Sequence, residues 1–178
     1  MVQLDKKSLR EYLITKRQCI IERDCKNACI KSKVLEISKN YNTIGIYVSV
    51  QDEIDTYEII KELFLQNKIV VVPKCVGDDL EFVQISSFSE LKKGYFGLYE
   101  PISNEYINKN SIDIMIVPLL GYDSSFNRIG YGKGFYDRYL QDYLGYKVGI
   151  AYHELRVESV YADNNDVLLD IVLTDEDC

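Results

Sequence analysis

Asp123-Ser-Ser-Phe-Asn-Arg-Ile-Gly-Tyr-Gly-Lys-Gly-Phe-Tyr-Asp-Arg138 concentrates more glycine and more charge than any other stretch of the chain. Before it, Ile112-Asp-Ile-Met-Ile-Val-Pro118 is a short β-branched run typical of a buried strand. After it, apolar residues recur at helical spacing and predict a helix that begins near Gly134: Phe135, Tyr136, Tyr139, Leu140 and Tyr143. The stretch is therefore a glycine-rich loop between a strand and a helix.

Three glycines alternate in this loop, and three cations lie in it or at its ends: Gly130, Gly132, Gly134, Arg128, Lys133 and Arg138. Glycine lets the backbone take positive φ and lets a ligand approach the main-chain N–H groups closely. The first turn of a helix adds unpaired N–H donors and a partial positive charge, which suit an anion. We interpret the loop as a phosphate-binding site; the alternative is a tight turn whose lysine is only solvated. Its spacing matches neither the dinucleotide fingerprint, which would need a glycine in place of Phe135, nor the Walker loop.

Hydrophobic periodicity along the rest of the chain indicates both helices and strands. The expected elements are helices at 4–23, at 24–39 and from 55–58 onward, and strands at 43–49, 68–73, 80–85 and 146–152. Ser8-Leu-Arg-Glu11 resembles a capping box for the first helix, and 91–101 reads as a loop. No internal repeat or linker divides the sequence, so we predict a single domain over residues 1–178. We expect a three-layer α/β/α fold with an open, mostly parallel sheet.

Length and composition limit the class of protein. The chain has 178 residues, of which 47% are hydrophobic and 28% charged, the mixture of a soluble globular protein. The net charge of −7 argues against general nucleic-acid binding, and a polyanionic ligand would have to be met by local lysines and arginines. No apolar run approaches the ~20 residues that span a bilayer, and the first residues lack the apolar core of a signal peptide. We therefore expect a cytoplasmic protein without a membrane partner.

The cysteines and the single histidine do not form a recognisable metal or nucleophile motif. The five cysteines are scattered and odd in number: Cys19, Cys25, Cys29, Cys75 and Cys178. His153 lies far from them in sequence, and a zinc site would need a tighter ligand set. We expect the cysteines to be buried thiols. One histidine and no nucleophile–base motif also argue against hydrolytic triad chemistry.

Three polar features outside the loop are ambiguous when each is taken alone. Lys6, Lys7 and Arg10 cluster at the start of the first helix, which is ordinarily a solvated basic end. Glu53 follows a strand, where ligands gather in open α/β sheets, but it could also be an acid that faces the start of the next helix. Asp163-Asn-Asn-Asp166 by itself indicates a turn.

Taken together, these features resemble the 5-formyltetrahydrofolate cyclo-ligase family. The likeness is carried chiefly by the central stretch: Pro118, Tyr122-Asp123, Arg128-Ile129-Gly130, Gly132-Lys133-Gly134 and Tyr136-Asp137-Arg138. Lys6-Lys-Ser-Leu-Arg10 and Glu53 match further segments of the family, and the likeness is weakest at 75–111 and 153–164. Three places depart from the family's usual residues. Phe135 stands where tyrosine is common and Asn165 where histidine is common, and Pro118-Leu-Leu-Gly-Tyr-Asp123 replaces the commoner Pro-Gly-x-Ala-Phe-Asp.

The resemblance implies a set of site residues. For ATP they are Lys6, Lys7, Ser8, Leu9, Arg10, Arg128, Ile129, Gly130, Tyr131, Gly132, Lys133, Gly134, Phe135 and Tyr136. For the folate substrate they are Val48, Glu53, Tyr131, Gly132, Lys133, Gly134 and Phe135. Lys133 and Arg128 would be catalytic, and Asp137 and Asp166 would bind Mg²⁺, which prefers carboxylate and phosphate oxygens.

The resemblance also implies a reaction. ATP phosphorylates the formyl oxygen of 5-formyltetrahydrofolate, N10 attacks the activated carbon, and 5,10-methenyltetrahydrofolate forms with release of ADP and phosphate. Such an enzyme needs positioning and charge stabilisation rather than a protein nucleophile. It implies a fold of the NagB/RpiA/CoA-transferase-like group, and we expect a monomer whose partners are small molecules.

Two alternatives from other functional classes remain open on the sequence. One is a non-catalytic nucleotide-binding module. The other is a sugar-phosphate isomerase or CoA-transferase-like enzyme of the same fold. An isomerase would need an acid/base carboxylate or histidine at the loop, and the lone His153 gives poor support for that.

Overall fold

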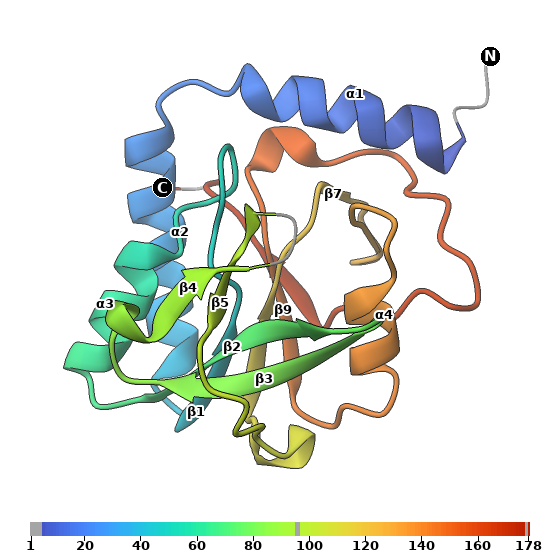
Figure 1. Cartoon of the computed structure of the whole chain (residues 1–178). Coiled ribbons are helices and arrows are strands. Elements are labelled where there is room, and N and C mark those ends of the chain that lie inside the picture. Colours follow the sequence, from blue (N-terminus) through green and yellow to red (C-terminus); the bar gives the residue numbers. More distant parts are fainter. Residues whose placement is uncertain (1–4, 95–96, 177) are drawn as a thin grey trace.

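The structure is a computed structural model that describes residues 5–94, 97–176 and 178 (Figure 1). Its centre is a six-stranded sheet in which five strands run parallel and only the edge strand β3 is antiparallel. In spatial order the strands are β10 (Ile171–Leu173), β9 (Tyr146–Ile150), β6 (Ile114–Val117), β1 (Thr43–Ile46), β2 (Ile69–Val76) and β3 (Asp79–Ile85). The predicted α/β fold with a mostly parallel sheet is confirmed.

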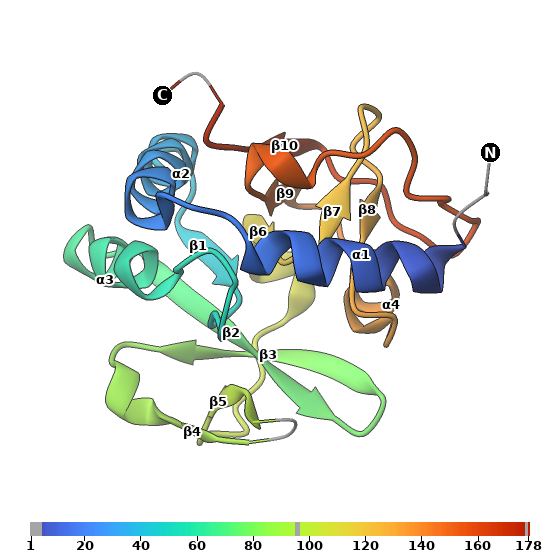
Figure 2. The ribbon, with the colours of Figure 1, turned by 90° about the horizontal axis from the view of Figure 1, so that it is seen from above.

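Helices cover both faces of this sheet. Among the described residues the α-helices are α1 (Lys6–Gln18), α2 (Arg23–Ser38), α3 (Tyr57–Leu65) and α4 (Phe135–Leu140). Helices α2 and α3 lie on one face and α4 on the other, while α1 crosses one end of the sheet (Figures 1 and 2). No described helix is long and apolar enough to cross a membrane.

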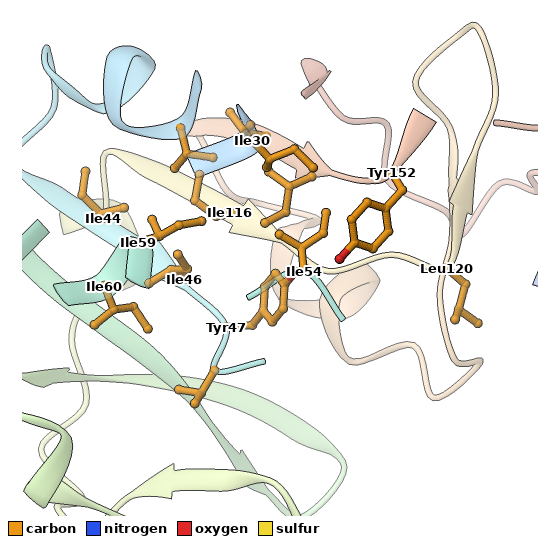
Figure 3. Packing of buried hydrophobic residues seen from close by; sticks show 14 of the residues in the cluster. Ile30, Ile44, Ile46, Tyr47, Ile54, Ile59, Ile60, Ile116, Leu120 and Tyr152 are labelled. Carbon is orange, nitrogen blue, oxygen red and sulfur yellow. The ribbon is translucent and has the colours of Figure 1, made fainter. Parts of the chain in front are cut away.

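The alternation of side chains along β6 explains why two cores form. Ile114 and Ile116 belong to the core under α2 and α3, whereas Met115 and Val117 belong to the core on the α4 face. Figure 3 shows Ile116 beside Ile44 and Ile46 of β1 in the first of these cores. A strand that buries both of its faces is a continuous apolar run, which is what the sequence has at this point.

The predicted helices exist, but their ends differ from expectation. Helix α1 begins at Lys6 because the Asp5 carboxylate caps it, accepting the Ser8 N–H at 2.7 Å, so the predicted capping box starting at Ser8 is wrong. Residue 4, where we expected the helix to begin, lies outside the described residues. Helix α4 is shorter than its apolar spacing predicts and ends at Leu140, where a turn follows in which Tyr143 N–H bonds to the Leu140 carbonyl.

Short strands were missed. The segment 91–101, expected as a loop, holds the antiparallel pair β4 (Leu91–Lys93) and β5 (Tyr99–Pro101); its residues 95–96 lie outside the described residues. A second hairpin, β7 (Gly121–Tyr122) with β8 (Arg128–Ile129), begins the central stretch. Strands of two or three residues are too short to give a recognisable alternation.

The prediction of five buried thiols is wrong. Cys19 and Cys25 are exposed, Cys75 is half-buried, and Cys29 is joined to Cys178 in a disulfide whose Cα atoms are 6.1 Å apart. The paired cysteines are 149 residues apart in sequence, so their spacing gives no sign of the contact. The disulfide attaches the C-terminal residue to helix α2.

Candidate functional site

The glycine loop follows the β7–β8 hairpin and has the backbone that was predicted for it. Gly132 and Gly134 have φ of 88° and 69°, a region that only glycine adopts freely, whereas Gly130 does not have a positive φ. Tyr131, Gly132 and Lys133 are all exposed. The loop therefore presents main-chain groups and a lysine to solvent. Helix α4 has only six residues, so the N–H groups of the loop itself are a better source of anion-binding donors than a helix dipole.

Helix α1 brings its basic end to this loop. Arg10 Nε donates to the Gly130 carbonyl at 2.9 Å, across 120 residues of sequence. The Arg10 guanidinium also lies against Gly132, where an added Cβ would be 3.1 Å from Cζ. Leu9, in contrast, is buried in the core at 3% exposure, so only its backbone can face a ligand. The structure thus brings two of the predicted ATP segments together.

The segment 163–166, which we call the tail, contacts the same region through ion pairs. Lys6 Nζ lies 2.6 Å from Asp163 Oδ2 and 2.6 Å from Asp166 Oδ2. These contacts raise the pKa of Lys6 against the opposing effect of its burial. The two carboxylates therefore hold the first turn of α1 against the segment 163–166, which the sequence predicted to be a turn.

Arg128 is almost completely enclosed, with a side-chain exposure of 4%. Its Nη2 donates to Asp137 Oδ1 at 2.7 Å and its Nη1 donates to the Val167 carbonyl at 2.6 Å. The Val167 N–H in turn donates to Asp137 Oδ1 at 3.0 Å. Asp137 is thereby fixed beside the backbone that follows Asp166, whose own carboxylate is held by Lys6 and the Asp163 N–H.

The donors in this network fit a magnesium ion. Within the described residues, hydrogen bonds use Oδ1 of Asp137 and Oδ2 of Asp166, and the other oxygen of each carboxylate makes no hydrogen bond. Mg²⁺ binds one or two carboxylates together with phosphate oxygens and water. Asp137 and Asp166 are carboxylates of this kind, and each is paired with a cation in this structure, Asp137 with Arg128 and Asp166 with Lys6.

A second, more enclosed region lies at the carboxyl ends of the sheet strands. Its cavity is small, about 10 Å³, and is lined by Arg17 of α1, by Tyr47 and Glu53 after β1, and by Leu119 and Tyr152 after β6 and β9. Figure 3 shows Tyr47 and Tyr152 on either side of Ile54. Val48, predicted to contact folate, is buried at 6% exposure directly after Tyr47. Ligands of open α/β sheets bind at such an edge.

Glu53 is the acidic group of this pocket. Its Oε2 accepts the Val50 N–H at 2.9 Å, and its Oε1 accepts the Tyr131 hydroxyl at 3.0 Å. Burial raises the pKa of Glu53, while these two hydrogen bonds and the charge of Arg17 act in the opposite direction. Because Tyr131 belongs to the glycine loop, the contact joins the pocket to the loop.

Arg17 is the site residue that sequence reasoning missed. It is buried at 6% exposure, and its Nη2 donates to the Tyr131 hydroxyl at 2.7 Å. A signal was present, because Leu9, Leu13 and Arg17 are four residues apart and share the buried face of α1. An arginine on an apolar stripe indicates a buried partner.

Helix α4, which directly follows the loop, begins with the aromatic residues Phe135 and Tyr136. Tyr136 packs its ring against Phe82 with centroids 6.5 Å apart, and its buried hydroxyl has no hydrogen bond within the described residues. Burial raises the pKa of Tyr136. Phe135 is half-buried beneath the Arg138 guanidinium, 5.5 Å from the ring centroid.

His153 lies in a different cluster from the loop residues. Its Nδ1 is 2.7 Å from Asp175 Oδ2 and 3.4 Å from Glu154 Oε2, and Lys26 also pairs with both acids. Carboxylates and a histidine could hold a cation, and the Lys26 ammonium already offsets one of the two negative charges of this group. His153 thus gives no support to an acid/base role at the glycine loop.

Comparison with known proteins identifies a family. The model of the 5-formyltetrahydrofolate cyclo-ligase family matches residues 2–175. A 5-formyltetrahydrofolate cyclo-ligase from Mus musculus is 31% identical over 153 residues, covering 78% of this chain and 75% of that protein. One from Haemophilus influenzae is 35% identical over 139 residues, covering 73% of this chain and 74% of that protein.

Solved structures give the same result. A 5,10-methenyltetrahydrofolate synthetase from Mycoplasma pneumoniae superposes with a TM-score of 0.80 and 27% identity, covering 97% of this chain and 100% of that one. The synthetase from Aquifex aeolicus gives a TM-score of 0.85 and 28% identity, covering 96% and 90%. The likeness therefore extends over the sheet, its helices and the glycine loop.

Proposed function

Because the chain belongs to the 5-formyltetrahydrofolate cyclo-ligase family, we propose that its glycine loop and its Glu53 pocket bind the two substrates of that reaction side by side. The chain converts 5-formyltetrahydrofolate to 5,10-methenyltetrahydrofolate, and the family is one of ATP-dependent ligases. The observation that carries the proposal is the hydrogen bond between Tyr131 of the loop and Glu53 of the pocket.

The loop holds the phosphates of ATP. Its N–H groups and the exposed Lys133 face one side of the ligand, and the start of α1 faces the other. The nucleotide-binding set is the one the sequence implied: Lys6, Lys7, Ser8, Leu9, Arg10, Arg128, Ile129, Gly130, Tyr131, Gly132, Lys133, Gly134, Phe135 and Tyr136. A guanidinium and ammonium groups on opposite sides can neutralise several phosphate oxygens at once.

The pocket holds the folate. Glu53 accepts the paired N–H donors of the pterin ring, and the buried Val48 and the ring of Phe135 supply apolar contacts. A carboxylate suits this task because its two oxygens accept adjacent donors in parallel. Residues 131–135 contact both substrates, because they lie between the phosphates and the pocket.

Asp137 and Asp166 would hold Mg²⁺ together with phosphate oxygens. The ion supplies charge neutralisation of the phosphate chain when it is bound. Arg128 contributes by fixing Asp137, to which it donates at 2.7 Å. In this proposal the carboxylates of Asp137 and Asp166 stay in place beside the glycine loop.

The chemistry then requires orientation rather than a protein nucleophile. Lys133 stabilises the charge on the phosphoryl group as it passes to the formyl oxygen, and the loop amides do the same. N10 of the same folate next attacks the activated carbon, and phosphate leaves. Lys133 and Arg128 are the catalytic candidates, the first at the transferred group and the second through its hold on Asp137.

Several coarser properties follow as part of the same proposal. Residues 1–178 act as a single ligase domain of the NagB/RpiA/CoA-transferase-like group. The protein works as a monomer in the cytoplasm, with ATP and folate as its partners and without nucleic acid or a membrane.

The test is direct. Protein, ATP, Mg²⁺ and 5-formyltetrahydrofolate are mixed, and the near-ultraviolet absorbance of the methenyl product is followed, with a parallel reaction in which EDTA removes the metal. We expect product only when both ATP and Mg²⁺ are present. Binding of ATP without any product would instead favour a nucleotide-binding module.

A further inference from the structure

Arg17 carries a buried charge without a direct counter-ion. It is 6% exposed, and within the described residues it forms no ion pair with a carboxylate. Its partners are the Tyr131 hydroxyl at 2.7 Å and the Tyr131 ring, whose centroid is 5.7 Å from Cζ. Its Nε is buried and has no hydrogen bond within the described residues. An isolated buried cation is costly, so an arginine in this setting calls for a reason.

The buried charge of Arg17 is compensated by Glu53, which lies one hydrogen bond beyond Tyr131. Arg17 donates to the Tyr131 oxygen, and the same hydroxyl donates to Glu53 Oε1 at 3.0 Å. Both donors in this relay point from the cation toward the carboxylate, so each bond polarises the next. The buried positive charge of Arg17 and the half-buried negative charge of Glu53 are therefore matched through one half-exposed tyrosine.

Glu53 has few other groups to keep it ionised. Besides Arg17, the groups that face it are the Val50 N–H and three tyrosines, Tyr47, Tyr131 and Tyr136. The tyrosines remain neutral at working pH, because burial raises the pKa of each one, that of Tyr131 to about 12. The hydrogen bonds from Val50 and Tyr131 oppose the desolvation of Glu53 first, and Arg17 is the cation that acts in the same direction.

We propose that Arg17 is a positioning residue for folate: through the Tyr131 hydroxyl it keeps Glu53 oriented and ionised to accept the N–H groups of the pterin ring. This inference rests on the proposed role of Glu53. Val50 and Tyr131 each occupy one lone pair of the carboxylate, so each oxygen retains another for the ligand. Arg17 itself does not contact the reacting atoms.

The experiment measures binding of 5-formyltetrahydrofolate without ATP, by titration calorimetry between pH 5 and 8.5, for wild type, Arg17→Met and Arg17→Lys. Loss of the charge raises the pKa of Glu53 further, so the acid limb of the affinity profile should move to higher pH in Arg17→Met. A movement of one pKa unit would weaken binding about tenfold at the acid end. In Arg17→Lys the acid limb should lie close to its wild-type pH, because lysine keeps the positive charge. Titration of the ligand is the same for all three proteins and cancels in the comparison.

Two further variants separate positioning from folding. Tyr131→Phe removes the relay without removing a charge and should move the limb in the same direction. Lys16→Met, one residue earlier on α1, should leave the profile unchanged. If Arg17→Met does not fold in circular dichroism, Arg17→Lys and Tyr131→Phe still decide the matter.

An equal loss of affinity at every pH, or an unmoved limb in Tyr131→Phe, would overturn the inference. Wild-type turnover and wild-type folate binding serve as the separate test of the proposed function. Their failure would reject the function itself, whereas normal wild-type behaviour with unmoved limbs would reject only the role of Arg17.

Discussion

The glycine loop and the Glu53 pocket are neighbours, yet their charges are in different environments. At the loop, Lys133 is exposed, and Lys6 pairs with Asp163 at side-chain exposures of 25% and 56%. In the pocket, Arg17 is 6% exposed. Water and salt screen the first group of charges strongly and the second group weakly. Position relative to solvent, rather than charge itself, therefore decides how much each residue contributes.

This difference suits two different ligands. A phosphate chain brings several charges of its own and can bind where solvated cations surround it. A pterin ring is largely uncharged and flat, so its affinity depends on hydrogen bonds in a dry pocket, where an unpaired donor is costly. The following predictions test the contrast, from the largest expected effect to the smallest.

Lys133→Ala should lower turnover about a thousandfold, as expected for loss of a group that stabilises transition-state charge. Thermal unfolding should be unchanged, because Lys133 is exposed. The matched control is Lys61→Ala on α3, another exposed lysine, which pairs with Glu58. Steady-state kinetics on both variants provide the measurement. An unchanged rate in Lys133→Ala would remove Lys133 from catalysis.

Asp137→Asn should destabilise the fold by about 3 kcal/mol, because it leaves the Arg128 guanidinium buried without its counter-charge. Urea unfolding with and without Mg²⁺ measures the loss. Glu36→Gln, which breaks the exposed pair with Lys39, should cost far less. Similar losses in the two variants would mean that burial of the Arg128 pair has no energetic consequence.

Glu53→Gln should weaken folate binding about tenfold to hundredfold, the range expected for hydrogen bonds to a charged group. Binding of ATP should change much less, since Glu53 lies in the pocket and not at the exposed loop. Glu58→Gln on α3 is the control for loss of a carboxylate. A larger loss of affinity for ATP than for folate would show that Glu53 belongs to the ATP site.

The smallest effect concerns stability and pH. The pKa of Glu53 is raised in the folded protein above the ordinary 4.5, so the folded state holds this proton at pH values where the unfolded chain has lost it. Wild type should therefore lose stability relative to Glu53→Gln as pH rises from 4.5 through the folded pKa. Thermal melts across that window measure the difference, which should vanish at lower pH. A constant difference at all pH values would show that desolvation of Glu53 is not its cause.

The parts of the site that depend on local backbone were predictable from sequence. The three alternating glycines were expected to allow positive φ, and Gly132 and Gly134 have it while Gly130 does not. Arg17 was not foreseen as a site residue, because its partner Tyr131 lies 114 residues away. The same holds for the disulfide between Cys29 and Cys178. Local spacing determines backbone conformation, but the partner of a buried side chain is determined by the packing of distant segments.

The secondary-structure elements also divide into those that were predictable from sequence and those that were not. The run that became β6 is continuous and apolar, so it was recognisable as a strand. The cap of α1 was assigned wrongly, because Ser8 fits a capping box in sequence while Asp5 reaches the Ser8 N–H in the structure. The hairpin at Gly121 was missed because each of its strands has two residues. A long hydrophobic pattern therefore predicts an element from sequence, whereas the role of a single side chain, such as Ser8 at the cap of α1, can be taken by a neighbour.

The ion pairs between Lys6 and the tail have a consequence for biosynthesis. A ribosome makes Lys6 157 residues before Asp163, so helix α1 emerges long before the acids that fasten it. Until then its buried face, with Leu9 and Leu13, has no complete surface to dock on, and such segments are prone to aggregate or to bind chaperones. Nascent chains arrested before this tail should therefore fail to retain nucleotide, even though they already contain every glycine of the loop.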